Sequence, residues 1–135
     1  MIAVDASILV AFFLREDLWY KLEKYIVRSV SIDQVIKEFY NAVWKACYKQ
    51  ARISEDDART IIDLFKAYAE KNLKLMNEND YIDYAYTISS EHDLSIYDAL
   101  YLAMAKKLNL PFITLDKRQA EVALKLGIKL ITPDI

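Results

Sequence analysis

The sequence predicts an α/β fold in which helices cover both faces of a central, mostly parallel sheet of four to five strands. Short β-type runs alternate with longer helical patterns along the whole chain, which is typical of strands joined through helices. A hydrophobic fraction of 55% in 135 residues supplies enough apolar side chains for a core, and no Pro/Gly/Ser-rich linker or repeat divides the chain. We therefore expect a single domain over residues 1–135.

Short apolar runs predict the strands. They are Ile2–Val4, Val30–Ile32, Leu73–Met76, Phe112–Leu115 and Lys129–Ile131. Because helical patterns separate these runs, the strands are expected to pair in parallel beneath the helices.

Helical periodicity predicts the segments between the strands. The expected helices are Ala6–Leu14, Leu18–Arg28, Asp33–Gln50, Ser54–Lys71, Asn79–Glu91, Ile96–Leu108 and Lys117–Leu126. Ser54 and Asp57 form an S-x-x-D capping box at the start of the fourth helix. Gly127 follows the last helix, where a glycine commonly ends one.

Cysteine usage and the N-terminal segment predict a cytoplasmic protein with no membrane insertion. Cys47 is the single cysteine, so it cannot form an internal disulfide, and its apolar neighbours predict a buried thiol in a reducing compartment. The apolar run after Asp5 has no cationic segment before it and no cleavage pattern after it. It is also much shorter than the ~20 residues that span a bilayer.

Four acidic residues stand at the edges of apolar segments, and they are Asp5, Glu38, Asp98 and Asp116. Asp5 and Asp116 follow predicted strands, and ligands of parallel α/β sheets collect outside the carboxyl ends of the strands. Carboxylates held together repel each other unless a proton or a cation intervenes, and oxygen ligands suit Mg²⁺ or Mn²⁺. This pattern indicates a metal-dependent hydrolase of phosphate esters.

Each acid also has a purely structural interpretation. Asp5 and Asp116 could be N-caps of the helices that follow them, which is a frequent role for aspartate. Asp98 lies three residues after Ser95 and could complete a second capping box. Glu38 could be a solvated helix residue.

Two helices weaken that structural interpretation. The helix around Glu38 is apolar except for a narrow polar stripe, on which Asn41 lies three residues further and could point into the same site. The helix that follows Asp98 is apolar on nearly all sides, so its first turn should face the interior, where a carboxylate needs a partner.

In order and spacing, the strings MIAVDASILV, EFYNAVWKA, LSIYDALYLAMAKKL and PFITLDKR resemble the acidic motifs of PIN domains, and most of all the VapC-type toxins of toxin–antitoxin pairs. The resemblance implies a three-layer α/β/α fold and a Mg²⁺- or Mn²⁺-dependent ribonuclease. Asp5, Glu38, Asp98 and Asp116 match the acidic catalytic and metal-binding positions of the family. Its supporting polar positions correspond to Ser7, Asn41 and Thr114. One departure is Ser31-Ile32-Asp33, where many relatives have a proline.

The expected roles follow from the chemistry of RNA hydrolysis. We assign Asp5 and Asp98 to direct metal coordination, and Glu38 and Asp116 to orienting waters or holding a second ion. The formal net charge of -2 gives little general attraction for a polyanion, so a local rim made of Arg15, Lys117 and Arg118 could steer the RNA.

The resemblance also implies partners, namely a VapB-type antitoxin whose helix fills a groove, and a second copy of the chain in a homodimer. Surplus aromatic side chains agree with this, since aromatics are enriched at interfaces. They are crowded at residues 12–20 and on one side of the helix carrying Tyr40, Trp44 and Tyr48.

Other catalytic designs are excluded by the residue inventory. His92 is the single histidine, which rules out a two-histidine ribonuclease, and Gly127 is the single glycine, which rules out glycine-rich phosphate loops. Ser7 stands where a haloacid-dehalogenase-type phosphatase has a second aspartate, and Lys129 lacks the following proline of a receiver domain. The remaining alternative is a PIN-like module that binds RNA or protein without cleaving it.

Overall fold

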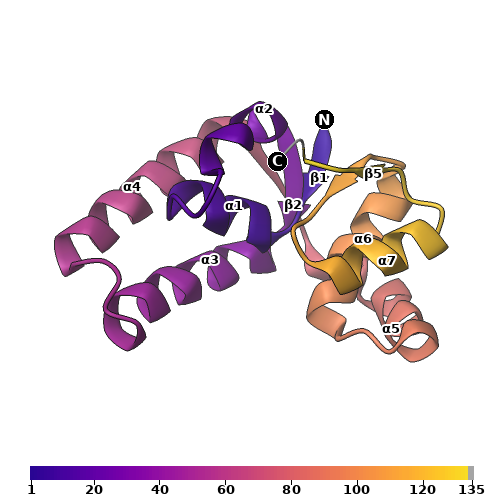
Figure 1. The fold of residues 1–135 in the computed structure, drawn as a ribbon. Coiled ribbons are helices and arrows are strands. Elements are labelled where there is room, and N and C mark those ends of the chain that lie inside the picture. The colour runs from indigo at the N-terminus through magenta and orange to yellow at the C-terminus, as the bar shows by residue number, and fades with distance from the viewer. Residues whose placement is uncertain (134–135) are drawn as a thin grey trace.

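A sheet of five strands, all parallel, forms the centre of the computed structural model, which describes residues 1–133 (Figure 1). The strands are β1 (Ile2–Val4), β2 (Ser29–Ile32), β3 (Leu73–Met76), β4 (Phe112–Ile113) and β5 (Leu130–Ile131). Their order across the sheet is β3-β2-β1-β4-β5. The prediction of a central parallel sheet is confirmed.

Helices cover both faces of this sheet. The first group is α1 (Ala6–Phe13), α2 (Glu23–Ile26), α3 (Gln34–Trp44) and α4 (Glu55–Asn72). The second group is α5 (Ile82–His92), α6 (Ile96–Leu108) and α7 (Lys117–Lys125). In Figure 1, α1, α3 and α4 lie on one side of the strands and α5, α6 and α7 lie on the other, which gives the predicted three layers.

The strand order creates one point at which successive connections leave in opposite directions. From β1 the chain adds β2 and then β3 on one side, whereas β4 pairs with the other side of β1 and β5 follows beyond it. Ala3 is paired with Phe112, and Val4 with Ile113, so β1 and β4 end side by side. A crevice at such a switch point is the usual ligand site of an open α/β sheet.

The core is apolar on both faces of the sheet. β2 is buried along its whole length, and α6 is buried without interruption from Ala99 to Ala105, as its sequence predicts. On the opposite face, Phe39 stacks on Phe65 with 3.8 Å between ring centroids, and Phe13 meets both rings edge-on. These rings join α1, α3 and α4 into one layer.

The predicted helix over residues 18–28 is wrong in its continuity. Leu18 adopts a left-handed conformation with φ 63°, a short 3₁₀ turn covers Trp19–Lys21, and α2 is only four residues long. Leu18 therefore lies outside the helix at its start, and Leu22, with φ -90° and ψ -17°, separates the 3₁₀ turn from α2.

The strand predicted at Phe112–Leu115 is shorter than expected, because Thr114 and Leu115 bond to Asp5 and Ser7 and do not pair with a neighbouring strand. Pairing in β4 stops at Ile113, and the Leu115 amide donates instead to Ser7 Oγ at 3.0 Å.

The predicted capping box at the start of α4 is confirmed, since the Asp57 amide donates to Ser54 Oγ at 3.0 Å and Asp57 Oδ2 accepts from the Ser54 amide at 3.2 Å. Over residues 1–133, no helix has both the length and the apolar character that crossing a membrane requires.

Candidate active site

A cleft of about 510 Å³ lies outside the carboxyl ends of β1 and β4, at the switch point of the sheet. The chain brings all four predicted acids to it, each from a different element: Asp5 follows β1, Glu38 is on α3, Asp98 is in the first turn of α6, and Asp116 precedes α7. The cleft is lined by Asp5, Ala6, Ser7, Val10, Glu16, Glu38, Ala42, Asp98, Leu115 and Asp116. Each of the two helical layers therefore contributes two acids: Asp5 and Glu38 come from the layer of α1 and α3, and Asp98 and Asp116 come from the layer of α6 and α7.

Asp5 is buried and held by three donors. Its Oδ1 accepts from Ser7 Oγ at 2.6 Å and from the Ile8 amide at 3.4 Å, and its Oδ2 accepts from Thr114 Oγ1 at 2.6 Å. The bond from Ile8 makes Asp5 the N-cap of α1. Burial raises the pKa of Asp5 from 3.8 to about 6, although the hydrogen bonds act in the opposite direction.

The hydroxyls of Ser7 and Thr114 connect the ends of β1 and β4. Their oxygens lie 3.3 Å apart, and Thr114 Oγ1 also accepts from the Asp116 amide at 3.0 Å. Together with the bond from Leu115 to Ser7, these contacts replace the β-ladder beyond Ile113 and fix the orientation of Asp5. Ser7 and Thr114 thus both contact Asp5 directly, each at a different carboxylate oxygen.

Glu38 is half-buried and its Oε1 is enclosed without a hydrogen-bond partner. Burial is the main cause that raises the pKa of Glu38 from 4.5 to about 7, and the charges of Asp5 and Asp98 add to it. The phenol of Tyr101 partly offsets this increase in pKa, although the Tyr101 hydroxyl and Glu38 Oε1 do not meet hydrogen-bond geometry. A buried carboxylate oxygen without a donor is costly unless a proton or a cation satisfies it.

Asp116 combines helix capping with exposure to the cleft, whereas α6 is capped by Ser95 and the carboxylate of Asp98 does not complete a capping box. The Asp98 amide donates to Ser95 Oγ at 3.2 Å, and the Gln119 amide donates to Asp116 Oδ1 at 3.0 Å. Burial, followed by the charge of Asp116, raises the pKa of Asp98. The capping interpretation of Asp5 and Asp116 is therefore correct, and it does not exclude a role in the cleft.

The donor set of the cleft fits a hard divalent cation. Within residues 1–133, no three His, Cys, Asp or Glu side chains are arranged closely enough to hold a metal ion as they stand. Two observations nevertheless favour a cation: burial, with a smaller contribution from neighbouring carboxylates, raises the pKa of Asp5, Glu38 and Asp98, and Glu38 Oε1 is buried without a donor. Oxygen ligands of this kind suit Mg²⁺ or Mn²⁺.

Asn41 does not join the cleft. It is exposed and lines a second groove, between α3 and α4. Residues three apart on a helix differ by about 60° in direction, whereas residues four apart differ by about 40°. Ala42, four residues after Glu38, is accordingly the next α3 residue in the cleft.

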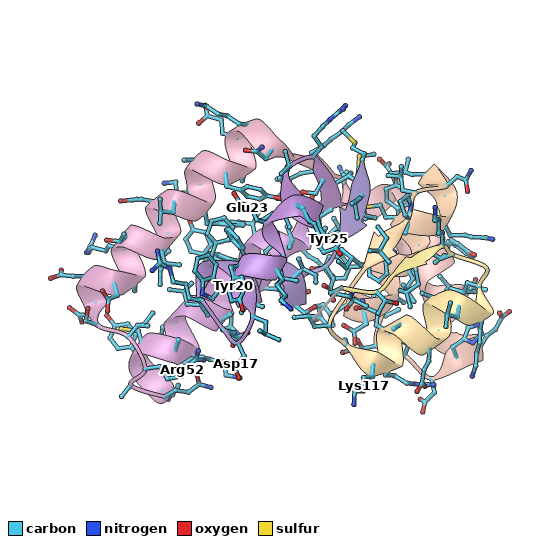
Figure 2. All side chains as sticks on the ribbon, turned by 45° about the horizontal axis from the view of Figure 1, so that its top comes forward. Asp17, Tyr20, Glu23, Tyr25, Arg52 and Lys117 are labelled. Carbon is cyan, nitrogen blue, oxygen red and sulfur yellow. The ribbon has the colours of Figure 1, made fainter. Side chains whose placement is uncertain are left out.

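The expected basic rim is only partly formed. Arg15 lies over the Trp19 ring, with 5.1 Å from its guanidinium carbon to the ring centroid. Arg118 donates to the His92 carbonyl and lies 3.6 Å from a Glu121 carboxylate oxygen. Lys117, at the start of α7, extends into solvent (Figure 2).

Two buried glutamines next to the acids were not predicted as site residues. Gln119 lies in the first turn of α7 and Gln34 at the start of α3, and both are buried. Gln119 follows Asp116 by three residues, which is the spacing of a capping box and could have drawn attention to it.

The second groove has a volume of about 600 Å³ and a mostly apolar lining. Its residues are Lys37, Tyr40, Asn41, Val43, Trp44, Cys47, Tyr48, Glu55, Ala58, Arg59 and Ile62. Tyr40, Trp44 and Tyr48 are exposed there. Cys47 is half-buried in this groove, which corrects the prediction of a buried thiol.

Comparisons with known proteins agree with this geometry. The PIN domain family model matches residues 2–125. Ribonuclease VapC3 of Pyrobaculum aerophilum is 26% identical over 123 residues, covering 89% of this chain and 92% of the relative.

Two solved structures share the fold. The crystal structure of PAE2754 from Pyrobaculum aerophilum has a TM-score of 0.69 and 23% identity, and covers 93% of this chain and 94% of that one. The structure of VapBC2 from Rickettsia felis, bound to a promoter DNA fragment, has a TM-score of 0.65 and 17% identity, with coverage of 99% and 100%.

Proposed function

Because the chain belongs to the PIN domain family, we propose that it is a metal-dependent endoribonuclease and the toxin of a toxin–antitoxin pair. The observation that carries the proposal is the meeting of Asp5, Glu38, Asp98 and Asp116 in one cleft at the switch point of the sheet. The relative VapC3, which is named a ribonuclease, supports RNA as the substrate.

The side chains of the cleft divide the work of hydrolysis. Asp5 and Asp98 would hold a Mg²⁺ or Mn²⁺ ion, with Glu38 and Asp116 beside it. When bound, the ion would lower the pKa of a water molecule and offset charge on the phosphate. Glu38, whose pKa burial raises to about 7 in the metal-free cleft, lies where it would accept the proton of the attacking water.

The hydroxyls around Asp5 keep this arrangement in place. Ser7 and Thr114 each donate to Asp5 at 2.6 Å, one to each carboxylate oxygen, so its rotation is restricted. Bonds of this kind orient carboxylate ligands and are usually worth about 10- to 100-fold in metal affinity or activity.

The proposal is tested by incubating a mixed RNA pool with the purified protein and Mg²⁺ or Mn²⁺, with chelator in a parallel reaction. Asp5→Asn removes a central carboxylate, and Asp63→Asn makes the same change on the exposed surface of α4 as a control. We expect cleavage by the wild type and by Asp63→Asn, and none by Asp5→Asn or with chelator.

The alternative is a PIN-like module that binds RNA or a protein without cleaving it. It predicts no cleavage with either ion while RNA still binds in a gel-shift assay. Cleavage that persists in both chelator and Asp5→Asn would instead indicate a contaminating nuclease and would leave the proposal without support.

The groove between α3 and α4 is the proposed site for a helix of a separately encoded VapB-type antitoxin. Exposed Tyr40, Trp44 and Tyr48 supply apolar surface, and Lys37 and Arg59 lie at the same groove. Such a surface fits an amphipathic helix. Trp44→Ala should weaken an antitoxin complex while leaving the cleavage of RNA by the free protein unchanged.

The proposal also includes a homodimer. The protein would act in the cytoplasm, where its RNA substrates would be. The N-terminal aromatics give the homodimer limited support: Phe13 packs in the core against Phe39 and Phe65, whereas Tyr20 is exposed. Size-exclusion chromatography with light scattering tests the dimer, and a strict monomer at micromolar concentration would contradict it.

A further inference from the structure

Two buried glutamines hold consecutive carbonyls in the first turn of α6. Gln34 Nε2 donates to the Tyr97 carbonyl at 2.6 Å, and Gln119 Nε2 donates to the Asp98 carbonyl at 3.0 Å. Gln34 is 4% exposed and Gln119 is 0% exposed. Burying an amide is unfavourable unless its hydrogen bonds are made, so these two bonds constrain where the turn can lie.

The glutamines come from the helices that bear the neighbouring acids. Gln34 lies four residues before Glu38 on α3, and Gln119 lies three residues after Asp116 on α7. The turn that they hold carries Asp98. The two bonds therefore tie α3, α6 and α7 together at the cleft.

Gln119 extends the connection to Asp5. A carbonyl oxygen can only accept, so the Gln119 amide must direct Nε2 at Asp98 and Oε1 at Thr114. Thr114 Oγ1 lies 2.9 Å from Gln119 Oε1 and 2.6 Å from Asp5 Oδ2, and its single proton can be donated to one of these two oxygens at a time. The turn that carries Asp98 is thus held by the helices that carry or follow Glu38 and Asp116, and Gln119 also contacts Thr114, which contacts Asp5.

We propose that Gln34 and Gln119 are positioning residues that clamp the first turn of α6 between α3 and α7. The clamp sets the separation of Asp98 from the other carboxylates, and thereby the affinity of the cleft for a divalent cation. This inference rests on the metal-dependent activity proposed above.

Methionine tests the clamp because it keeps the length of glutamine and removes its hydrogen bonds. We expect Gln34→Met and Gln119→Met each to weaken Mn²⁺ binding about 10- to 100-fold, as measured by calorimetry on the purified protein. RNA cleavage by either variant should need correspondingly more Mn²⁺ for half-maximal rate and should recover when Mn²⁺ is in large excess.

Val43→Ala and Val122→Ala are the matched controls. They remove buried methyl groups from α3 and α7 without touching a polar contact. They should lower the thermal midpoint and leave the Mn²⁺ affinity unchanged. If Gln119→Met does not fold, Gln119→Leu and the Gln34→Met variant provide the same comparison.

The possible outcomes separate the inference from the function on which it rests. Weaker Mn²⁺ binding in the glutamine variants but not in the valine controls would support the clamp. Wild-type affinity in both glutamine variants, with RNA cleavage by the wild type intact, would overturn the clamp alone. A wild type that neither binds Mn²⁺ nor cleaves RNA would overturn the proposed function and the clamp with it.

Discussion

Replacing Asp5 with asparagine is expected to change the pH dependence of the metal-free protein's stability, so that the stability of the variant relative to the wild type increases as the pH rises. Burial raises the pKa of Asp5 from 3.8 to about 6 in the folded state. Below about pH 4 the carboxyl is protonated in both the folded and the unfolded chain, so its ionisation costs nothing. Between about pH 4 and pH 6 the unfolded chain loses this proton first, which lowers the free energy of unfolding.

The size of the change in unfolding free energy follows from the difference between the pKa of Asp5 in the unfolded and the folded state. A difference of about two pKa units, at 1.36 kcal/mol each, corresponds to about 3 kcal/mol lost by the wild type above about pH 6. Asparagine has the same shape and does not ionise, so Asp5→Asn escapes the loss. The difference in unfolding free energy between variant and wild type should therefore increase by about 3 kcal/mol from about pH 4 to pH 7.

Urea unfolding followed by circular dichroism, in chelator and across this pH range, measures the difference. Asp63→Asn, on the exposed surface of α4, controls for the loss of one negative charge. Excess Mg²⁺ should narrow the gap, because it would bind the ionised wild-type cleft in preference to the variant. A gap that stays constant with pH, or shrinks as the pH rises, would refute the reasoning.

Three further substitutions probe the fold and the site. Phe39→Ala should lower the free energy of unfolding by about 3–5 kcal/mol in urea titrations, because the ring is buried and stacks on Phe65. Ser54→Ala should cost about 1 kcal/mol in the same assay, because the capping box of α4 is lost, and no change would argue against the cap. Tyr101→Phe removes a buried hydroxyl that lowers the pKa of Glu38, so the pH profile of RNA cleavage should move to higher pH with stability nearly unchanged. A shift to lower pH would contradict this.

Local sequence patterns predicted correctly those helices that show a clear apolar run or a capping motif. The apolar run at Ile96–Leu108 and the capping box at Ser54 appear in the structure as expected. The run at 18–28 was predicted as one helix, but it starts with a left-handed Leu18 and is divided at Leu22 into a 3₁₀ turn and α2. A backbone conformation of this kind depends on the packing around it, which the local pattern does not contain.

The four acids of the candidate site could be predicted from the sequence, whereas the hydrogen bonds that hold them in place could not. The carboxylates stand out because charge beside apolar strands is unusual, and the strand ends place Asp5 and Asp116 together. Gln34 and Gln119 do not stand out, because their partners lie 63 and 21 residues away along the chain. Asn41 was misplaced because its three-residue spacing from Glu38 turns it toward α4.

The bond from Thr114 to Asp5 joins residues 109 positions apart, and it lies at the seam between the first and last parts of the chain. During synthesis, Asp5 and Glu38 would leave the ribosome long before Thr114, Asp116 and Gln119. Because β4 must pair with β1 before the cleft is assembled, a growing chain would carry three of the four acids, Asp5, Glu38 and Asp98, without an active centre. Under the proposed function, this order of assembly would delay the onset of toxicity until β4 and the start of α7 have been made.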